Sequence, residues 1–365
     1  NFNILHYELL TFTYVAFHYM SEPDSNTSKR KSEHIKLCLT DNVSFREKTN
    51  GFENYDFIHS AVTEVDISKI SFQQKLFGKQ INYPFLISCM TGGTTESENI
   101  NSMLAEVAED LRIPIGVGSQ RQALENAYFH DTYKVIRRKA ANVPVLGNIG
   151  AAQIVHINVK EIQKLIDMLE ADAFVVHLNP LQELLQPEGE PYFVGLLKKI
   201  EFICKKISVP VIAKEVGSGI DKISAKKLLD VGVKGIDVAG AGGTSWAGVE
   251  LIRKNDLKNP FWDWGLPTAY CIRKVAELKK NYKFLLIGSG GINSATDMAK
   301  AFALGADLTA SARIILQTLL NGNQEQVKIL IEKWFGYLKQ VMFLTNSQKL
   351  TDLKRNKIYK KELLT

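Results

Sequence analysis

Short apolar runs alternate with amphipathic stretches along most of the chain from Tyr83 onwards. Eight of these runs are rich in valine, isoleucine, leucine and alanine, the composition of parallel strands that are buried on both faces. The stretches between them, such as VKEIQKLIDMLE and SATDMAKAFALG, place apolar residues at helical spacing, and several end in glycine. The predicted strands are residues 85–90, 114–119, 143–150, 173–179, 209–216, 235–242, 284–291 and 306–312.

Eight strand–helix units in succession predict a (β/α)8 TIM barrel, an α/β fold whose sheet closes and leaves no strand edge exposed. A doubly wound open sheet is the alternative, although such a sheet usually has fewer strands. We expect a single barrel domain over residues 28–345, with a long loop at 244–270 after the sixth strand. An N-terminal extension at 1–27, either disordered or foreign to the natural protein, and a C-terminal tail at 346–365 complete the predicted organisation.

The first twenty residues are apolar but include Glu8 and have no basic segment before the apolar run, which argues against a signal peptide or a membrane anchor. Met20 directly precedes a polar stretch, so residues 1–19 either belong to the natural protein or precede its start. Elsewhere no apolar run reaches the roughly 18 residues of a membrane span. We therefore expect no membrane partner.

The charge of the chain narrows the choice of ligand. The formal net charge of +6 comes from scattered lysines, so it fits an acidic small molecule as well as nucleic acid. Without a motif of stacking aromatic residues, we expect no nucleic-acid partner. The four cysteines (Cys38, Cys89, Cys204 and Cys271) lie far apart without metal-ligand spacing, which predicts reduced thiols and a cytoplasmic protein.

Glycine-rich turns follow several of the predicted strands, at the barrel face where this fold places its chemistry. A single turn of this kind is weak evidence, because glycine often serves only a tight corner. The seventh strand, however, ends in GSGGI before a helix, and Ser-Ala-Arg opens the helix after the eighth. Backbone amides and a helix N-terminus in this arrangement typically bind a terminal phosphate.

Several polar side chains are expected at the same face. Lys214 lies inside an apolar strand, so we expect its ammonium group to face the barrel mouth, toward an anion or a cofactor, unless it extends outward into solvent. Thr91, Ser119, Asn148 and Thr244 sit at neighbouring strand ends and suit the polar edge of a flat heterocycle, although each alone could be a turn former. Together with the phosphate site, they suggest flavin mononucleotide (FMN).

A second anion site is predicted from the basic arm SKRKSEH. Its Arg30, Lys31 and His34, with Arg121 after the second strand, could bind a diphosphate, and the alternative is a solvated basic segment. Glu183 could then hold Mg²⁺, which proteins commonly bind through one or two carboxylates plus substrate phosphates. A helix-capping or ion-paired role for Glu183 stays open at this point.

The motifs RKSEH, MTGGT, GVGSQR, GNIGA, HLNPLQE, KEVGSG, GAGGTSW, WGLPTA and GSGGI occur in this order. In order and spacing they resemble the type 2 isopentenyl-diphosphate isomerases, over about Ser28 to Leu353, and HLNPLQE with GGTSW is highly specific. The resemblance implies interconversion of isopentenyl and dimethylallyl diphosphates in isoprenoid biosynthesis. It also implies reduced FMN, Mg²⁺, NADPH as the flavin reductant, and a homo-oligomer, a tetramer or octamer. The first nineteen residues have no counterpart in that family.

The resemblance also implies roles for individual residues. Gln182, His177 and Asn179 would be catalytic, and Glu183 would bind the metal. Substrate binding would fall to Arg30, Lys31, His34, Ser119, Gln120, Arg121 and Gln182. FMN would be bound by Thr91, Gly92, Gly93, Ser119, Asn148, Lys214, Thr244, Gly290, Gly291, Ile292, Ser311 and Ala312.

This assignment explains why HLNPLQE supplies amides, an imidazole and a carboxylate without a serine or cysteine nucleophile. Moving a double bond requires removal of one proton and addition of another, and a reduced flavin can serve as acid and base. An FMN-dependent 2-hydroxy-acid oxidase is the rival, but residues 244–269 contain no histidine that could act as its base. A dehydrogenase of the inosine-monophosphate type would need a cysteine nucleophile in a strand-end loop, and none of the four cysteines lies in such a loop. A non-enzymatic flavin sensor stays open.

Overall fold

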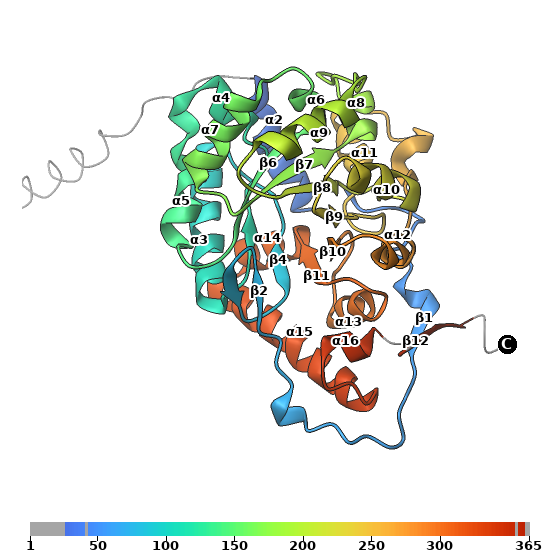
Figure 1. Cartoon of the computed structure of the whole chain (residues 1–365). Coiled ribbons are helices and arrows are strands. Elements are labelled where there is room, and N and C mark those ends of the chain that lie inside the picture. The colour runs from blue at the N-terminus through green and yellow to red at the C-terminus, as the bar shows by residue number, and fades with distance from the viewer. Residues whose placement is uncertain (1–25, 41–42, 355–356, 362–365) are drawn as a thin grey trace, which may run out of the picture.

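Eight parallel strands close into a barrel that is surrounded by helices (Figure 1). The computed structural model describes residues 26–40, 43–354 and 357–361, so the expectations for residues 1–25 fall outside it. The strands follow the closed order β10-β11-β4-β5-β6-β7-β8-β9, which confirms the predicted (β/α)8 barrel. They are β4 (Phe85–Ile87), β5 (Ile115–Gly116), β6 (Val145–Gly150), β7 (Ala173–Leu178), β8 (Val211–Glu215), β9 (Gly235–Asp237), β10 (Leu285–Gly288) and β11 (Leu308–Ser311).

The helices follow from capping residues and amphipathic spacing. In α7 (Val159–Leu169), Asn158 and Glu161 form a capping box, and the buried face carries Ile162, Leu165 and Ile166. The other helices around the barrel and at its carboxyl face are α3 (Thr95–Leu111), α4 (Arg121–Glu125), α5 (Asp131–Lys139), α6 (Ala151–Ile154), α8 (Pro180–Leu185), α9 (Leu196–Lys206), α10 (Lys222–Asp230), α11 (Trp246–Arg253), α12 (Thr268–Ala276), α13 (Ala295–Ala303), α14 (Arg313–Asn321) and α15 (Gln324–Leu344). Short 3₁₀ helices lie at Phe52–Asn54, Ile67–Lys69, Ala127–Phe129, Pro260–Asp263 and Glu277–Lys280.

The inside of the barrel is divided into an apolar and a polar layer. Side chains alternate along each strand, so every second residue points inward. Leu146, Val175 and Ile212 belong to the buried apolar cluster that fills the barrel. Two residues further along the same strands come Asn148, His177 and Lys214; β9 adds Asp237, and the residue after β10 adds Ser289. A ring of polar side chains therefore closes the apolar core at the carboxyl ends of the strands.

A hairpin covers the opposite, amino-terminal end of the barrel. Strands β2 (Gln74–Leu76) and β3 (Lys79–Ile81) pair antiparallel, and Leu76 and Ile81 join the apolar cluster inside the barrel. The turn between them consists of Phe77 and Gly78, which both have positive φ (49° and 84°). This geometry matches the two-residue turn that fits the twist of a hairpin. The barrel is thus open toward its carboxyl face.

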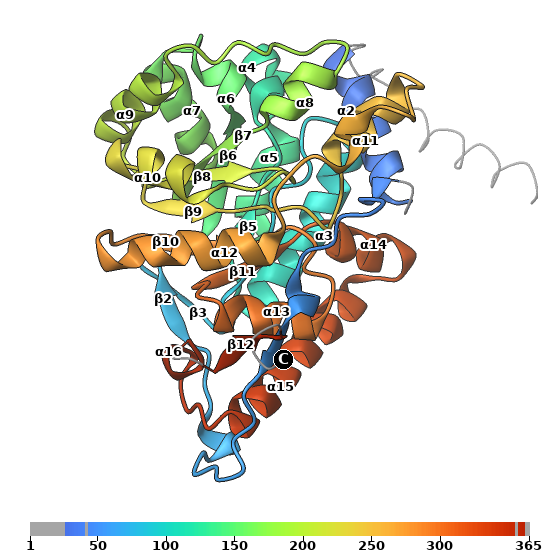
Figure 2. The ribbon, with the colours of Figure 1, turned by 90° about the vertical axis from the view of Figure 1, so that its right-hand side faces the viewer.

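The segments on either side of the barrel come back to it. Helix α2 (Asn26–Cys38) lies beside α11 on the carboxyl face (Figure 2). Strand β1 (Tyr55–Phe57) pairs antiparallel with β12 (Ile358–Lys360), and α16 (Leu350–Leu353) packs on α13 and buries Leu353. The described part of the predicted tail is therefore packed against the barrel. Among the described residues, no helix combines the length and apolar character needed to cross a bilayer.

Candidate active site

A cavity of about 260 Å³ opens at the carboxyl ends of the strands. Its wall includes α2 and residues that follow each of the eight strands, so loops that are far apart in sequence share one space. Most of the predicted site residues line it: Arg30, Lys31, His34, Thr91, Gly92, Ser119, Arg121, Asn148, His177, Asn179, Gln182, Glu183, Lys214, Thr244, Gly290, Gly291, Ser311 and Ala312. The cavity therefore gathers both predicted ligand sites in one place.

Three predicted site residues do not line this cavity. Gln120 is fully buried, and its side chain accepts from the amide of Asn148 (2.9 Å) and donates to the carbonyl of Leu165 (3.2 Å). Ile292 is buried among the apolar core residues. Gly93 donates its amide to the hydroxyl of Thr132 (2.9 Å). In this structure the side chain of Gln120 holds the segment that carries Asn148.

The polar ring fixes the protonation of His177. The side-chain nitrogen Nδ2 of Asn148 donates to the carbonyl of Val117 (3.2 Å). This contact places the side-chain oxygen Oδ1 of Asn148 3.0 Å from Nδ1 of His177. Since that oxygen can only accept, Nδ1 carries the proton and Nε2 is left as an acceptor. Burial, with Lys214 and Lys31 nearby, lowers the pKa of His177 to about 4. At neutral pH the ring is therefore uncharged.

Lys214 points into the barrel, as predicted, but it meets a carboxylate that the sequence reasoning did not single out. Its Nζ donates to the carbonyl oxygen of Glu215 (3.0 Å) and lies 3.4 Å from Oδ2 of Asp237. The register of β8 and β9 places Lys214 directly opposite Asp237. The hydroxyl of Ser289, from the loop after β10, donates to the other carboxylate oxygen. The lysine thus has a protein counter-ion within the polar ring.

The loops after β10 and β11 line one end of the cavity. Gly290 and Gly291 adopt positive φ (96° and 65°), and a side chain on either would overlap the backbone of the loop after β9. Ser311 ties the two loops together by donating to the carbonyl of Ile292 (2.8 Å). Arg313 begins α14, and its Nη1 is buried with no hydrogen-bond partner among the described residues. This unmatched cation at a helix N-terminus fits the phosphate of FMN.

Helix α2 brings Lys31 into the mouth of the barrel. Its ammonium group donates to the carbonyl oxygens of Gly92 and Ser119 (the latter at 3.0 Å) and to the hydroxyl of Tyr133 (3.0 Å). Burial, and then the charge of Arg30, lower the pKa of Lys31 to about 7. An anion bound beside it would favour the charged form.

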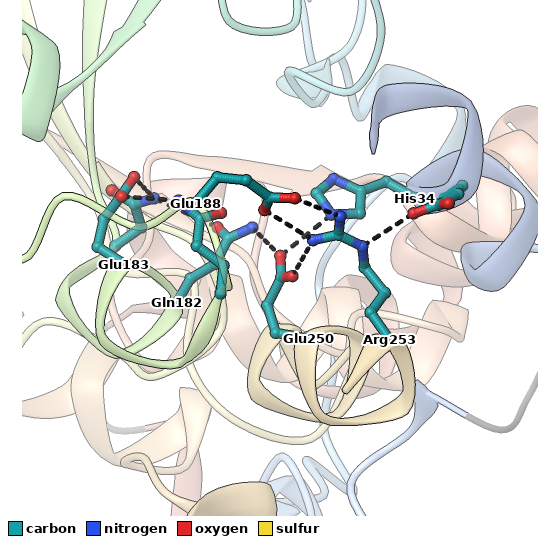
Figure 3. A network of polar contacts seen from close by, with 9 residues as sticks. His34, Gln182, Glu183, Glu188, Glu250 and Arg253 are labelled. Atoms are coloured by element: carbon teal, nitrogen blue, oxygen red, sulfur yellow. Dashed lines mark hydrogen bonds and ion pairs between the residues drawn. The ribbon is translucent and has the colours of Figure 1, made fainter. Parts of the chain in front are cut away.

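A charged network joins α2 to α8 and α11 (Figure 3). At its centre is the fully buried Glu250, whose Oε1 accepts from Gln182 (2.9 Å) and lies 3.0 Å from Nε2 of His34. Arg253 donates to the second oxygen of Glu250 (2.7 Å) and forks onto both oxygens of Glu188 (3.1 and 3.3 Å). Burial alone would raise the pKa of Glu250, but hydrogen bonds from its partners lower it to about 2. Gln182 and His34 are therefore oriented by one ionised carboxylate.

Glu183 faces neutral donors. Its two oxygens accept from the side chains of Asn179 (2.9 Å) and Gln186 (2.7 Å) and from the amide of Glu190 (2.9 Å). Oδ1 of Asn179, beside it, is buried without a hydrogen-bond partner among the described residues. A cation would match both oxygen types, although the described part of the chain contains no group of three potential metal-ligating side chains. Mg²⁺ would fit here with further ligands from a substrate phosphate.

The sequence reasoning passed over four charged residues: Asp237, Glu250, Arg253 and Arg313. Each had a signal. Asp237 interrupts an apolar strand in the same way as Lys214, and Glu250 lies in the apolar helical stretch WAGVELI. Arg313 is the arginine of the Ser-Ala-Arg segment, and Arg253 lies one helical turn after Glu250. A charge inside an apolar element indicates a buried partner, and this signal could have identified Asp237 and Glu250.

Comparison with known proteins defines the class first. The sequence pattern of a family described as FMN-dependent dehydrogenase matches residues 24–136 and 184–360. Among solved structures, flavocytochrome b2 with pyruvate bound superposes with a TM-score of 0.67 at 18% identity, over 90% of this chain and 83% of that one. A lactate oxidase of Pediococcus acidilactici gives 0.63 at 15% identity, over 91% and 90%. These likenesses show the fold, and the family match places the protein among the FMN-dependent barrels.

Within that class, the sequence relatives are more specific. An isopentenyl-diphosphate delta-isomerase of Chlorobium phaeobacteroides is 43% identical over 95% of this chain and 99% of its own length. Proteins of the same name from Nostoc sp. (44%; 91% of this chain, 95% of that protein) and Pelodictyon phaeoclathratiforme (42%; 94% and 100%) agree. The chain belongs to the FMN-dependent isopentenyl-diphosphate delta-isomerase family, which confirms the resemblance found in its motifs.

Proposed function

We propose that the protein interconverts isopentenyl diphosphate and dimethylallyl diphosphate with reduced FMN and Mg²⁺. The names of its relatives support the reaction. The observation that carries the proposal is one cavity with a glycine-rich turn and Arg313 at one end, Arg30, Lys31 and Arg121 at the other, and polar side chains between them. One region fits the phosphate of a flavin and the other a diphosphate.

FMN would lie with its phosphate at Gly290, Gly291, Ser311, Ala312 and Arg313. Its ring would extend across the polar ring of the barrel, with Thr91, Ser119, Asn148 and Thr244 along its edge and Lys214 near the pyrimidine end. When bound in the reduced form, the flavin would supply a nitrogen acid and base close to the alkene. Nη1 of Arg313 is buried and has no hydrogen-bond partner within the described ranges, and this observation supports the phosphate end.

The diphosphate would be held between α2 and α8. Arg30, Lys31 and Arg121 would supply positive charge, and His34 would donate from its ring. Glu183 would hold Mg²⁺ against the phosphate oxygens, with Oδ1 of Asn179 beside it, which accepts no hydrogen bond from the described part of the chain. Because a diphosphate attracts the arginines and the metal together, binding of substrate and Mg²⁺ should be mutually dependent.

The side chains between the two anions would position the hydrocarbon part. Gln182 is oriented by Glu250, and His177 presents an uncharged acceptor nitrogen. These groups, with Asn179, would orient the alkene and its neighbouring carbon without donating a strong nucleophile. Gln120 would act indirectly, by supporting Asn148.

Three further features are proposed from the family resemblance. NADPH would reduce the flavin without being consumed at each turnover, and the chain would assemble as a tetramer or octamer. A cytoplasmic location agrees with four cysteines that are all free thiols.

The decisive experiment is turnover under anaerobic conditions. Protein reconstituted with FMN, reduced by dithionite and supplied with Mg²⁺ should convert isopentenyl diphosphate with many turnovers per flavin, because substrate and product are isomers. In deuterated water, the new methyl group should contain deuterium while the flavin spectrum stays that of the reduced form. The oxidised protein serves as the control and should be inactive. Stoichiometric consumption of NADPH or oxygen would overturn the isomerase assignment in favour of an oxidase.

A further inference from the structure

Asp237 is a buried charge for which the proposed chemistry has no use so far. Its side chain is 1% exposed and lies inside the barrel, below the cavity. One carboxylate oxygen accepts from Ser289, and the other has no hydrogen bond among the described residues but lies 3.4 Å from the ammonium group of Lys214. A buried carboxylate is costly unless it is paired, so this contact accounts for its presence.

The strand register fixes this pair beneath the cavity. His177, Lys214 and Asp237 are opposite one another on β7, β8 and β9, so they lie at the same level of the barrel. Lys214 lines the cavity, whereas Asp237 does not. The aspartate can therefore act on a ligand in the cavity through Lys214 and through Ser289, its two polar neighbours that line the cavity. Such an arrangement fixes the place of the ammonium group and offsets part of its charge.

We propose that Asp237 is a positioning residue that holds Lys214 against the flavin and sets the net charge that the pair presents to the ring. This inference rests on the proposed placement of FMN. A lysine alone at the pyrimidine end would strongly stabilise the negative charge of the reduced ring and would make that ring a weaker base. In the Lys214–Asp237 pair, the ammonium group still donates toward the ring. The carboxylate offsets part of its positive charge, so the reduced ring loses less of its basicity. That suits a site which moves protons and has to return the flavin to the same state after each turnover.

Two substitutions that should shift the flavin midpoint potential in opposite directions test the proposal. Asp237→Asn leaves the lysine without its counter-charge, so the reduced flavin is stabilised and the midpoint potential rises. We expect at least a tenfold change in the reduction equilibrium, which is about 30 mV for a two-electron couple. Lys214→Met should lower the potential, and the double variant should lie near the parent. The potentials are measured by anaerobic titration of the FMN-loaded proteins, with the pH at which the reduced flavin becomes anionic as a second spectroscopic readout; that pH should fall in Asp237→Asn.

A matched control comes from the other end of the barrel. Asp172 pairs with Arg137 (2.6 Å) and Lys79 (3.1 Å), and its substitution with asparagine also removes a partly buried ion pair. Asp172→Asn should lower thermal stability and leave the potential unchanged. If Asp237 has a purely structural role, Asp237→Asn should likewise lower thermal stability without changing the flavin potential, or Asp237→Asn and Lys214→Met should shift the potential in the same direction. Either result would overturn the inference.

A second variant covers the case in which Asp237→Asn does not retain flavin. Ser289→Ala removes a donor from the carboxylate and leaves more negative charge beside Lys214. The flavin potential should then fall, and a rise or no change would count against the proposal. Failure of the proposed function is distinguishable, because the parent protein itself would then bind no FMN or show no isomerase turnover.

Discussion

Lys31 is a side chain whose protonation is expected to depend on whether the diphosphate is bound. In the free protein its ammonium group is buried among carbonyl oxygens, and its pKa is lowered to about 7. Binding of a diphosphate restores the charged form, so binding takes up a proton wherever the free lysine is neutral. The favourable contribution of the Lys31 charge to the free energy of diphosphate binding is fully present below pH 7 and is lost as the pH rises above 7.

We therefore expect the dissociation constant of isopentenyl diphosphate to rise with pH above 7, by up to about tenfold per pH unit, in the parent protein. Lys31→Arg, which keeps its charge throughout, should lack this increase even if its affinity is lower at pH 6.5. Calorimetric titration between pH 6.5 and 9 measures both curves. Parallel curves for the two proteins would assign the dependence to another group.

Glu183 is the residue on which the metal proposal depends. Glu183→Gln keeps the amide contacts in reach but removes the charge, so we expect a 10 to 100-fold loss of Mg²⁺ affinity or of activity at limiting Mg²⁺. The flavin spectrum should not change, because Glu183 is assigned to the diphosphate side. Activity is measured over a Mg²⁺ titration, with Glu201→Gln on the outer helix α9 as the control. Coincident titrations for Glu183→Gln and the parent would remove the metal assignment.

The sequence indicated which residues at the carboxyl ends of strands lie together around the cavity, while their roles stay predictions. Asn148, Lys214 and Gly290 interrupt or end apolar runs, and the closed barrel necessarily brings such positions together. It could not predict the partners across the cavity. Arg253 meets Glu33, which is remote in sequence, and Asp237 meets Lys214 only because two strands have a particular register. Gln120 was placed on the substrate from the motif, but its side chain turns to the backbone of Asn148 and Leu165.

At the scale of elements, α2 is the part of the cavity wall that does not belong to the barrel repeat. Lys31 fastens it to the loops after β4 and β5, and Arg253 of α11 fastens it through Glu33 (2.9 Å). The basic arm was visible in the sequence. Its helical form and its position beside α11 were not, because they depend on these remote contacts.

Arg253→Met should loosen this fastening. It removes the pairs with Glu33, Glu188 and Glu250 together, and charged hydrogen bonds of this kind contribute about 1.5–3 kcal/mol when buried and less at exposed positions such as Glu33. We expect amide hydrogen exchange in residues 29–38 to become about tenfold faster and substrate binding to weaken, while the exchange of β6 and β7 is unchanged. Arg138→Met, which removes an exposed arginine on α5, is the control. Unaltered exchange in α2 would show that Lys31, the His34–Glu250 contact and packing hold the helix without Arg253.

For the whole molecule, the two ends of the barrel differ: stabilising contacts close the amino end, and the candidate site lies at the carboxyl end. The hairpin of β2 and β3 and the ion pairs around Asp172 close the amino end, whereas the carboxyl end gathers the cavity. The alternating pattern of the sequence was sufficient to predict eight strands and their closure. The pairing of β1 with β12 could not be predicted in the same way, because short strands of mixed polarity carry little periodicity.

The closed strand order has a consequence for the newly made chain. Strand β11 joins β10 to β4, and it is the last of the eight to leave the ribosome. Until then, β4 and β10 are the two unpaired edges of an incomplete sheet, and such edges attract other strands. The nascent chain therefore remains prone to aggregation during the greater part of its synthesis. Chaperone occupancy on nascent chains of increasing length should drop sharply once β11 and α15 have emerged.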